Sequence, residues 1–184
     1  MIDPYLVGFR RGDGSVSKRK DGAYAVWVDQ AHKNRTIFEK GVLPRFKLLG
    51  PKVYSYTYYA RNDKTSKHRA LVYSKALYME LRKIFHDIKA YIDNLSDEDA
   101  KRFIAGMMDA EGTVTDRVVI YNKNTRLLRI SQSRLEKLGI TDTHIYKFRV
   151  VHGLQIYRRG SLKRFVGEIP AVKLMIKQID RLSD

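Results

Sequence analysis

One short signature occurs twice in this chain of 184 residues. Residues 6–14 read LVGFRRGDG, and residues 104–112 read IAGMMDAEG. Each copy is an apolar run with small residues four positions apart, closed by one carboxylate and a glycine. The two carboxylates, Asp13 and Glu111, are 98 positions apart, and the leading glycines have the same separation. One register therefore relates the two halves, so the chain is predicted to fold as two similar units.

The small residues predict that the two signature helices pack against each other. Gly8 and Gly12 lie four apart, as do Gly106 and Ala110. Residues four apart share one face of a helix. A face without side chains lets two helix backbones approach closely. One such pair would favour packing on a sheet, whereas two pairs at matching positions favour contact between the helices.

Close packing would bring the two carboxylates together at the ends of the helices. A helix C-terminus already carries about half a negative charge, so Asp13 and Glu111 should repel each other and need cations. Mg²⁺ accepts carboxylate, carbonyl and phosphate oxygens, and the free carbonyls of Gly12 and Ala110 are predicted as further ligands. Two metals could activate water and stabilise the leaving 3′ oxygen of a phosphodiester. Helix C-caps without a metal are the alternative.

The charge balance points to a polyanionic partner. The formal net charge is +16, and both halves are basic: residues 1–92 carry 19 Lys/Arg against 8 Asp/Glu, and residues 93–184 carry 17 against 12. The absence of cysteine excludes disulfides and cysteine-ligated zinc. No segment reads as a membrane span or a signal peptide, so an intracellular protein without a membrane partner is expected. The five histidines lack metal-ligand spacing and are predicted to lie on the surface or in loops.

The periodicity of apolar residues predicts the same element order in each half. In the first half we expect a helix ending near Gly12, strands at 15–20 and 23–28, a helical segment at 32–49 interrupted by Pro44, strands at 53–61 and 69–73 around a loop at 62–67, and a helix at 74–87. In the second half we expect a helix at 97–110, strands at 113–115 and 117–122, a helix at 124–138, strands at 147–151 and 154–157 around a turn at His152-Gly153, and helices at 161–167 and 171–182.

This order predicts an α+β fold with a mixed four-stranded sheet in each half. The expected units are residues 1–93 and 99–184, joined by a linker at 94–98.

The two signatures resemble the paired motifs of LAGLIDADG homing endonucleases, of the single-chain type with two repeats. The resemblance covers nearly the whole chain. The second copy matches closely through Ala105-Gly106 and Asp109-Ala110-Glu111-Gly112. The first copy has Arg10 and Arg11 where the family pattern has apolar residues.

The resemblance implies two αββαββα repeats related by a pseudo-twofold axis, each sheet forming half of a DNA-binding saddle in the major groove. Asp13 and Glu111 would bind Mg²⁺ or Mn²⁺, with two or three ions shared at the repeat interface. Such an enzyme hydrolyses both strands of a long, nearly palindromic DNA target and leaves four-base 3′ overhangs. Its reading frame usually lies in an intron or intein, and a monomer is expected.

The resemblance also implies that polar residues at the ends of the strands after each signature support catalysis, and Gln30 and Asn122-Lys123 match those places. A lysine such as Lys123 can stabilise charge on the phosphorane, and a glutamine such as Gln30 can orient water. Basic and aromatic residues of the strands and their loops are predicted to bind DNA, some reading bases and some contacting phosphates. These predicted DNA contacts are Lys18, Arg19, Lys20, Tyr24, Tyr54, Tyr56, Tyr58, Arg61, Arg69, Arg117, Asn122, Lys147, Arg149, Tyr157 and Arg159.

Two other functions remain open on this resemblance. One is an RNA-binding maturase that helps an intron to splice, and intron RNA is therefore a possible partner. The other is a non-cutting DNA-binding regulator with the same fold. Loss of the acids would favour the regulator, and here both Asp13 and Glu111 are present.

Overall fold

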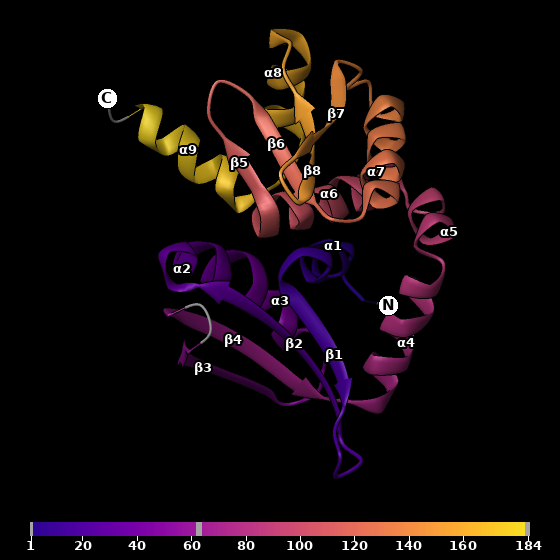
Figure 1. Cartoon of the computed structure of the whole chain (residues 1–184), viewed down its shortest axis with the longest axis vertical. Coiled ribbons are helices and arrows are strands. Elements are labelled where there is room, and N and C mark those ends of the chain that lie inside the picture. The colour runs from indigo at the N-terminus through magenta and orange to yellow at the C-terminus, as the bar shows by residue number, and fades with distance from the viewer. Residues whose placement is uncertain (1, 62–63, 183–184) are drawn as a thin grey trace.

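Two signature helices form the centre of the computed structural model, which describes residues 2–61 and 64–182. Helices α1 (Pro4–Asp13) and α6 (Asp97–Glu111) lie side by side, with one four-stranded sheet below them and another above (Figure 1). The first repeat continues with β1 (Gly14–Lys18), β2 (Tyr24–Ala31), η1 (His32–Asn34), α2 (Arg35–Ile37), η2 (Phe38–Val42), α3 (Leu43–Lys47), β3 (Val53–Ala60), β4 (Thr65–Tyr73), α4 (Lys75–His86) and α5 (Ile88–Asp93). The second continues with β5 (Gly112–Val114), β6 (Val118–Asn122), α7 (Thr125–Lys137), β7 (Thr143–Phe148), β8 (Val151–Ile156), α8 (Arg159–Glu168) and α9 (Val172–Leu182).

Both central helices begin at strong capping residues. Asp3 accepts a hydrogen bond from the backbone N–H of Tyr5 at 2.9 Å, and Pro4 occupies the first turn of α1. Ser96 accepts from the N–H of Asp99 at 3.2 Å, and the first turn of α6 is acidic, which suits the positive end of its dipole. The sequence therefore determines locally where each central helix starts.

Glycine allows the two central helices to touch through their backbones. A Cβ added at Gly8 would overlap the carbonyl oxygen of Phe103, and one added at Gly106 would lie 2.7 Å from the backbone nitrogen of Phe9. Neither position has room for a side chain. The predicted contact between the two signature helices is thus confirmed, and packing on a sheet is not what these small residues serve.

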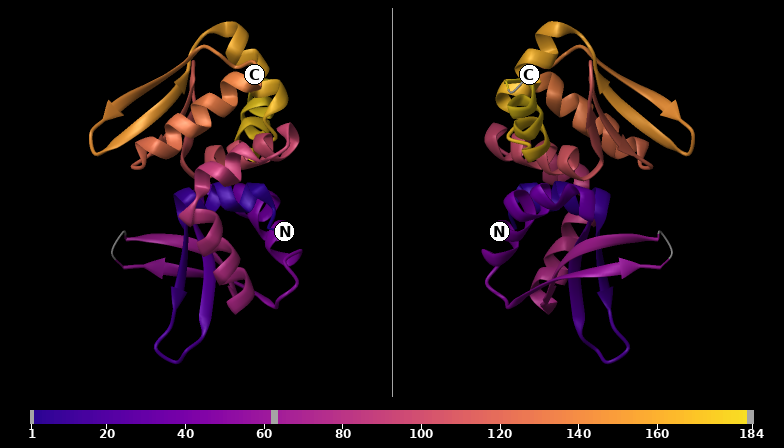
Figure 2. Two further views of the ribbon diagram at one scale, coloured as in Figure 1. Left: turned by 90° about the vertical axis from the view of Figure 1, so that its right-hand side faces the viewer. Right: turned by 90° about the vertical axis from the view of Figure 1, so that its left-hand side faces the viewer.

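The two sheets have the same topology. Their strand orders are β1-β2-β4-β3 and β5-β6-β8-β7, and each neighbouring pair is antiparallel. The prediction of mixed sheets was therefore wrong, because hairpins link β1 to β2 and β3 to β4 and the return strand also runs antiparallel. In both views of Figure 2 the β3–β4 and β7–β8 hairpins extend to the same side of the molecule. The α+β fold of two αββαββα repeats is confirmed.

Several strand boundaries differ from the prediction: β2 continues to Ala31, and β7 and β8 begin at Thr143 and Val151 instead of residues 147 and 154. Strand β4 begins at Thr65 instead of Arg69; its first residues are exposed on both faces and carry no apolar alternation. Of the predicted loop, residues 62–63 lie outside the described part of the chain. The turn between β7 and β8 falls at Arg149 (φ +53°), while Gly153 lies within β8, where an added Cβ would come within 3.0 Å of Val119 and Tyr146. Gly153 thus serves close packing.

The segment between the repeats is shorter than predicted. Helix α5 extends to Asp93, and α6 begins at Asp97, so the last two residues of the predicted linker at 94–98 are helical. The helical segment at 32–49 is divided into four short pieces, with Pro44 in the first turn of α3 as expected from its missing N–H. The division into repeats at 1–93 and 99–184 stays a prediction.

Alternate residues of each strand face opposite sides of the sheets. In the first sheet Val26, Val28, Ala70 and Val72 are buried beneath the helices. They belong to one hydrophobic core that continues through α1 and α6 into the second repeat. The opposite side of each sheet carries no covering helix in Figures 1 and 2, and we call it the open face.

Candidate active site

The C-terminal ends of α1 and α6 meet, and each presents its carboxylate there. A Cβ added at Gly12 would lie 2.5 Å from Cγ of Glu111 and 2.6 Å from Cβ of Ala110. Asp13 is the next residue along α1. The matched spacing in the sequence is thus realised as two carboxylates at one junction, beside helix ends whose last carbonyls lack intrahelical partners.

Burial disfavours the charged forms of both acids, and repulsion by Glu111 adds to this for Asp13. Burial, followed by the charge of Glu111, raises the pKa of Asp13 to about 7. Burial also raises the pKa of Glu111, while Lys173 and Lys123 act in the opposite direction. Lys173 and Lys67 favour the charged form of Asp13. The protein therefore holds two carboxylates where a cation is required to make full ionisation favourable.

The sheet registers place matching strand ends beside the two acids. The pairing of β1 with β2 ends at Gly14 and Val28, and β2 continues two residues further to Gln30. The pairing of β5 with β6 ends at Gly112 and Ile120, and β6 continues two residues further to Asn122. The Nδ2 group of Asn122 donates across the repeat interface to the carbonyl oxygen of Arg11 at 3.4 Å. Gln30 and Asn122 therefore occupy equivalent places, as the sequence predicted.

The side chains at the two strand ends differ in burial and in charge. Gln30 is only 2% exposed, and its Oε1 accepts from the N–H of Ala31 and from Nδ2 of Asn34, both at 2.9 Å. Its Nε2 is buried without a hydrogen-bond partner in the described part of the chain. Lys123, by contrast, is exposed, and in the first repeat its equivalent is Ala31. Only the second repeat carries a lysine at this position.

Two concavities open on either side of Glu111. One, of about 280 Å³, is lined by Arg11, Gly12, Glu111, Asn122 and Lys123, with Tyr121 and Val151. The other, of about 710 Å³, includes Ala110, Glu111 and Lys173. Each has both acidic and basic side chains in its lining, so a phosphate and its cation would find complementary groups in either.

The donor set fits a divalent metal that also binds a phosphate. Two carboxylates and the carbonyls of Gly12 and Ala110 are hard oxygen ligands of the type that Mg²⁺ and Mn²⁺ accept. Among residues 2–61 and 64–182, no group of three or more His, Cys, Asp or Glu side chains gathers as a metal site. Mg²⁺ commonly binds through one or two carboxylates plus water and substrate phosphate, so a two-carboxylate site suits it.

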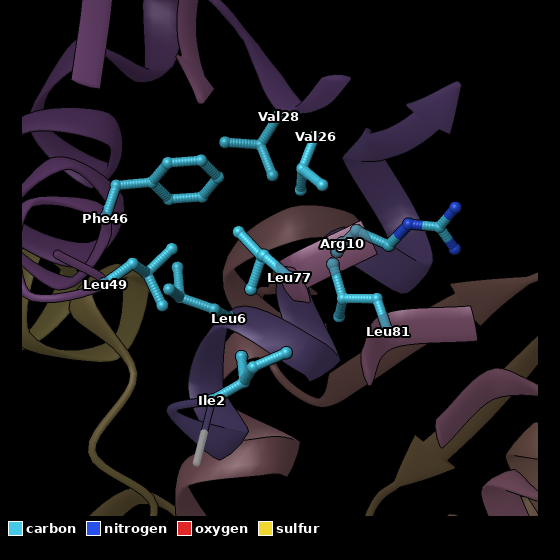
Figure 3. A pocket seen from close by; sticks show the side chains of 9 residues that line it. All are labelled: Ile2, Leu6, Arg10, Val26, Val28, Phe46, Leu49, Leu77 and Leu81. Atoms are coloured by element: carbon cyan, nitrogen blue, oxygen red, sulfur yellow. The ribbon is translucent and has the colours of Figure 1, made fainter. Parts of the chain in front are cut away.

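Arg10 and Arg11, which depart from the apolar pattern, both stack on one ring of α4. Their guanidinium carbons lie 4.2 and 4.8 Å from the ring centroid of Phe85. Figure 3 shows the stem of Arg10 beside Leu77 and Leu81, with its guanidinium directed away from the apolar side chains. Burial, then the neighbouring Arg11, lowers the pKa of Arg10 to about 10. A long aliphatic stem thus replaces an apolar residue while its charge reaches the surface.

Sequence reasoning missed Asp109 and Lys173. Asp109 is fully buried and accepts from the hydroxyl of Tyr5 at 2.8 Å and from the N–H groups of Val172 and Lys173 at 2.8 and 2.7 Å. Nζ of Lys173 donates to the carbonyl oxygen of Gly112 at 2.6 Å. Asp109 carried a signal, because it is a carboxylate within an apolar helix. Lys173 carried none, because it lies 62 residues beyond Glu111 in an ordinary amphipathic helix.

The open face of the first sheet carries an aromatic and basic surface. Tyr54, Tyr56 and Tyr58 pair with residues of β4 that include Arg69 and Lys67. Arg69 donates to both carboxylate oxygens of Asp29 at 2.7 Å and to the hydroxyl of Tyr58 at 3.0 Å. These hydrogen bonds raise the pKa of Arg69 and hold its guanidinium in place. The register places Tyr54, Tyr56, Tyr58 and Arg69, among the predicted DNA contacts, on this face.

Other predicted contacts lie at the ends of the strands. Lys18, Arg19 and Lys20 are exposed near the β1–β2 turn, and Arg19 donates to the hydroxyl of Tyr73 at 2.9 Å. Arg61 and Arg149 are exposed next to the other two hairpin turns. Arg117, Tyr157 and Arg159 line a concavity that also includes Leu162 of α8.

Four predicted contacts lie on the opposite register: Lys18, Tyr24, Asn122 and Lys147. Tyr24 lies in register with the buried face of β2, and its ring packs 4.9 Å from that of Tyr78 in α4. Lys147 alternates with Tyr146 and Phe148, so it lies on the register opposite to theirs. Side chains alternate between the two faces of a strand, so the orientation of one residue must be known before the others can be assigned to a face. The sequence alone gives no such residue, because the strand register is not known.

Several open-face residues of the second sheet were missed. By register this face carries Tyr121, His144, Tyr146, Phe148 and Gln155. The rings of Tyr121 and Phe148 lie 5.8 Å apart, and those of His144 and Tyr146 are stacked. The histidine prediction was wrong for His68, which is 8% exposed; it bonds Thr57 and stacks between His32 and Phe38.

The fold and the paired acids define a single chain with two LAGLIDADG-type repeats. A family model described as a LAGLIDADG-like domain matches residues 98–170. The homing endonuclease I-DmoI of Desulfurococcus mucosus is 30% identical over 161 residues, which cover 84% of this chain and 79% of that protein. The chain therefore belongs to the LAGLIDADG homing endonucleases.

Solved structures agree with this assignment. The structure of I-DmoI in complex with DNA and Mn matches with a TM-score of 0.72 and 27% identity, over 91% of this chain and 95% of that one. The complex of I-DmoI with DNA and Ca matches with a TM-score of 0.73, also at 27% identity, over 94% and 91%. The N-terminal LAGLIDADG domain of DUF199/WhiA shares the fold, with a TM-score of 0.65 at 15% identity over 95% and 85%.

These comparisons give no support to intron RNA as a partner. Within the described part of the chain, no helix has the length and apolar character needed to cross a membrane.

Proposed function

We propose that this protein is a site-specific, divalent-metal-dependent DNA endonuclease that hydrolyses both strands of a long, nearly palindromic target and leaves 3′ overhangs. The observation that carries this proposal is the meeting of Asp13 and Glu111 at the junction of two duplicated helices. The relatives in complex with DNA and Mn or Ca support the choice of substrate and of cofactor. A monomer suffices, because one chain contains both repeats.

Asp13 and Glu111 are the proposed metal ligands, with the carbonyls of Gly12 and Ala110. Two or three Mg²⁺ or Mn²⁺ ions shared at the repeat interface would activate water and stabilise the leaving oxygen when bound. The protein's part is to hold two carboxylates at one place although they repel each other. The helix contact through Gly8 and Gly106 provides the rigid support for this arrangement.

Gln30, Asn122 and Lys123 are the proposed supporting residues. The buried Nε2 of Gln30 lacks a hydrogen-bond partner in the described part of the chain and can donate to a water or a phosphate oxygen. Lys123 lies in the concavity beside Glu111 and can stabilise the extra negative charge of a pentavalent phosphorane. Because the first repeat has Ala31 at the equivalent position, the two strands of DNA would meet different supporting groups.

The open faces are the proposed DNA saddle. Tyr54, Tyr56, Tyr58 and the fixed guanidinium of Arg69 would contact one half of the target, and the open-face residues of the second sheet the other half. Exposed lysines and arginines at the hairpin turns would contact phosphates, which position the protein without reading sequence. The excess of basic residues in both halves supports a duplex that crosses both sheets.

The test is cleavage of a duplex library with Mg²⁺, followed by sequencing of the cut ends. Asp13→Asn or Glu111→Gln should abolish cleavage while affinity for the recovered target, measured with Ca²⁺, changes little. Exposed Asp21→Asn is the matched control and should cleave normally. Full cleavage by either active-site variant at the usual Mg²⁺ concentration would remove the proposed site. An intron-splicing assay run in parallel would detect maturase activity.

A further inference from the structure

Helices α6 and α9 cap each other beside the catalytic acids. The carboxylate of Asp109, in the last turn of α6, accepts from the N–H groups of Val172 and Lys173, the first two residues of α9. Such N–H groups have no partner within their own helix. Asp109 therefore anchors the start of α9 next to the end of α6.

The side chain of Lys173 in turn hydrogen-bonds to the C-terminal end of α6. Its Nζ donates to the carbonyl oxygens of Gly112 at 2.6 Å and Met108 at 3.2 Å. These two residues bracket Ala110 and Glu111, the proposed ligands of the second repeat. A cation at a helix C-terminus also offsets the negative end of the dipole. The ammonium group therefore fixes the segment that carries Glu111 and places a positive charge beside it.

The same charge acts on both catalytic acids. Burial lowers the pKa of Lys173, whereas Asp109, Asp13 and Glu111 act in the opposite direction. Lys67 acts on Asp13 and Lys123 on Glu111, but Lys173 is the lysine that acts on both. It is also partly buried, so water screens its charge less than that of a surface lysine.

The first repeat is built differently at the corresponding positions. Ninety-eight residues before Met108 and Asp109 stand Arg10 and Arg11, which stack on Phe85. At the end of both helices a carbonyl accepts from the N–H of the capping glycine, Arg10 from Gly14 and Met108 from Gly112, and Met108 accepts from Lys173 as well. The lysine contact thus belongs to one half of a site whose acids are otherwise paired.

We propose that Lys173 is a positioning residue and a built-in counter-charge of the catalytic centre. It holds the Glu111 segment in place and partly neutralises the two acids. Its positive charge therefore opposes the binding of divalent cations to these acids. This rests on the proposed function, since it takes Asp13 and Glu111 as the metal ligands. Removing the charge should weaken the metal-free fold and strengthen metal binding at the same time. A lysine that served only as a helix cap would do the first without the second.

The experiment measures Ca²⁺ binding and thermal unfolding of the full chain without DNA. Lys173→Met removes the charge and the hydrogen bonds, Lys173→Gln keeps a donor without the charge, and Lys173→Arg keeps the charge. Lys163→Met, on the exposed side of α8, is the control. Titration calorimetry gives the Kd for Ca²⁺, and unfolding in EDTA and in saturating Ca²⁺ gives the two Tm values.

Lys173→Met and Lys173→Gln should lower Tm in EDTA, bind Ca²⁺ about fourfold more tightly, and gain more Tm from Ca²⁺ than the parent protein. That factor is the smallest expected: it corresponds to one unit charge acting on a divalent ion about 10 Å away in bulk water, and the partial burial of Lys173 reduces this screening. Lys173→Arg and Lys163→Met should keep the parent Kd within about twofold. If Lys173→Met fails to fold, Lys173→Gln gives the same comparison.

An unchanged Kd, with equal losses of Tm in EDTA and in Ca²⁺, would refute the proposed role of Lys173 as a counter-charge. Lys173 would then serve only as a helix cap. That result would not touch the proposed function if the parent protein binds Ca²⁺ and cleaves DNA. Failure of the parent protein to bind any divalent ion, alone or with DNA, would overturn both.

Discussion

Asp13→Asn should stabilise the metal-free protein, although it removes a catalytic ligand. Burial and Glu111 raise the pKa of Asp13 from 3.8 to about 7. The folded state therefore keeps a proton that the unfolded state releases, so stability falls as pH rises from about 4 and the full cost is present above about 7. The difference of about three pKa units corresponds to about 4 kcal/mol, or about 2–4 kcal/mol once structural relaxation is allowed. The amide avoids this cost.

The assay is thermal unfolding in EDTA between pH 4.5 and 8.5. At about 2–4 °C per kcal/mol for a chain of this length, Asp13→Asn should raise Tm at pH 8 by at least about 4 °C. The gain should shrink to about a quarter of that value at pH 4.5, because most of the cost is lost as the pH approaches the unfolded pKa of 3.8. Asp116→Asn is the control: Arg117 lowers the pKa of Asp116 to about 2, so its loss should bring no gain. A Tm at pH 8 no higher than that of the parent protein would refute the electrostatic account of the site.

Three further predictions follow from the packing and charge. Gly106→Ala places a methyl group against the backbone of α1 and should lower the free energy of unfolding by about 1–3 kcal/mol in urea titrations, whereas Gly167→Ala, where a Cβ meets open space, should not destabilise. Lys123→Met should slow single-turnover cleavage about 10²-fold with Kd nearly unchanged; an equal loss in both would assign Lys123 to binding. Target affinity should fall steeply between 50 and 200 mM salt, and an affinity that does not change with salt would argue against the saddle. Arg69→Met should reduce the slope of log affinity against log salt by less than one, because Asp29 already pairs with this guanidinium.

The duplication explains why so much of the fold could be predicted. A helix ends where its capping residues and glycines allow, and Asp3, Pro4, Ser96 and Gly112 give those signals within a few residues. Small residues four apart on two matched helices leave few partners other than each other. These constraints are local, and the duplication repeats them at matching positions. A boundary predicted in one repeat can therefore be checked against the other.

The orientation of strand residues could not be settled in the same way. Tyr24 and Tyr56 have similar neighbours in the sequence, yet one packs on α4 and the other lies on the open face. Which alternate set of residues faces the helices depends on cross-strand pairing, and the pairs of β2 with β4 join residues 36 to 48 positions apart. The β7–β8 turn was misplaced for a related reason. Gly153 lies within β8, where Val119 and Tyr146 leave no room for a side chain, and this close packing exists only in the folded sheet.

By itself the sequence determined the two repeats, the helices that join them and the acids at their ends, because spacing along a helix is a property of the chain. Only the tertiary structure decided what surrounds those acids. Lys173 reaches the end of α6 because Asp109 captures the start of α9, and no periodicity in the sequence links residues so far apart. Electrostatics acts through space, so the charge balance of the site depends on contacts that form only once the core has folded.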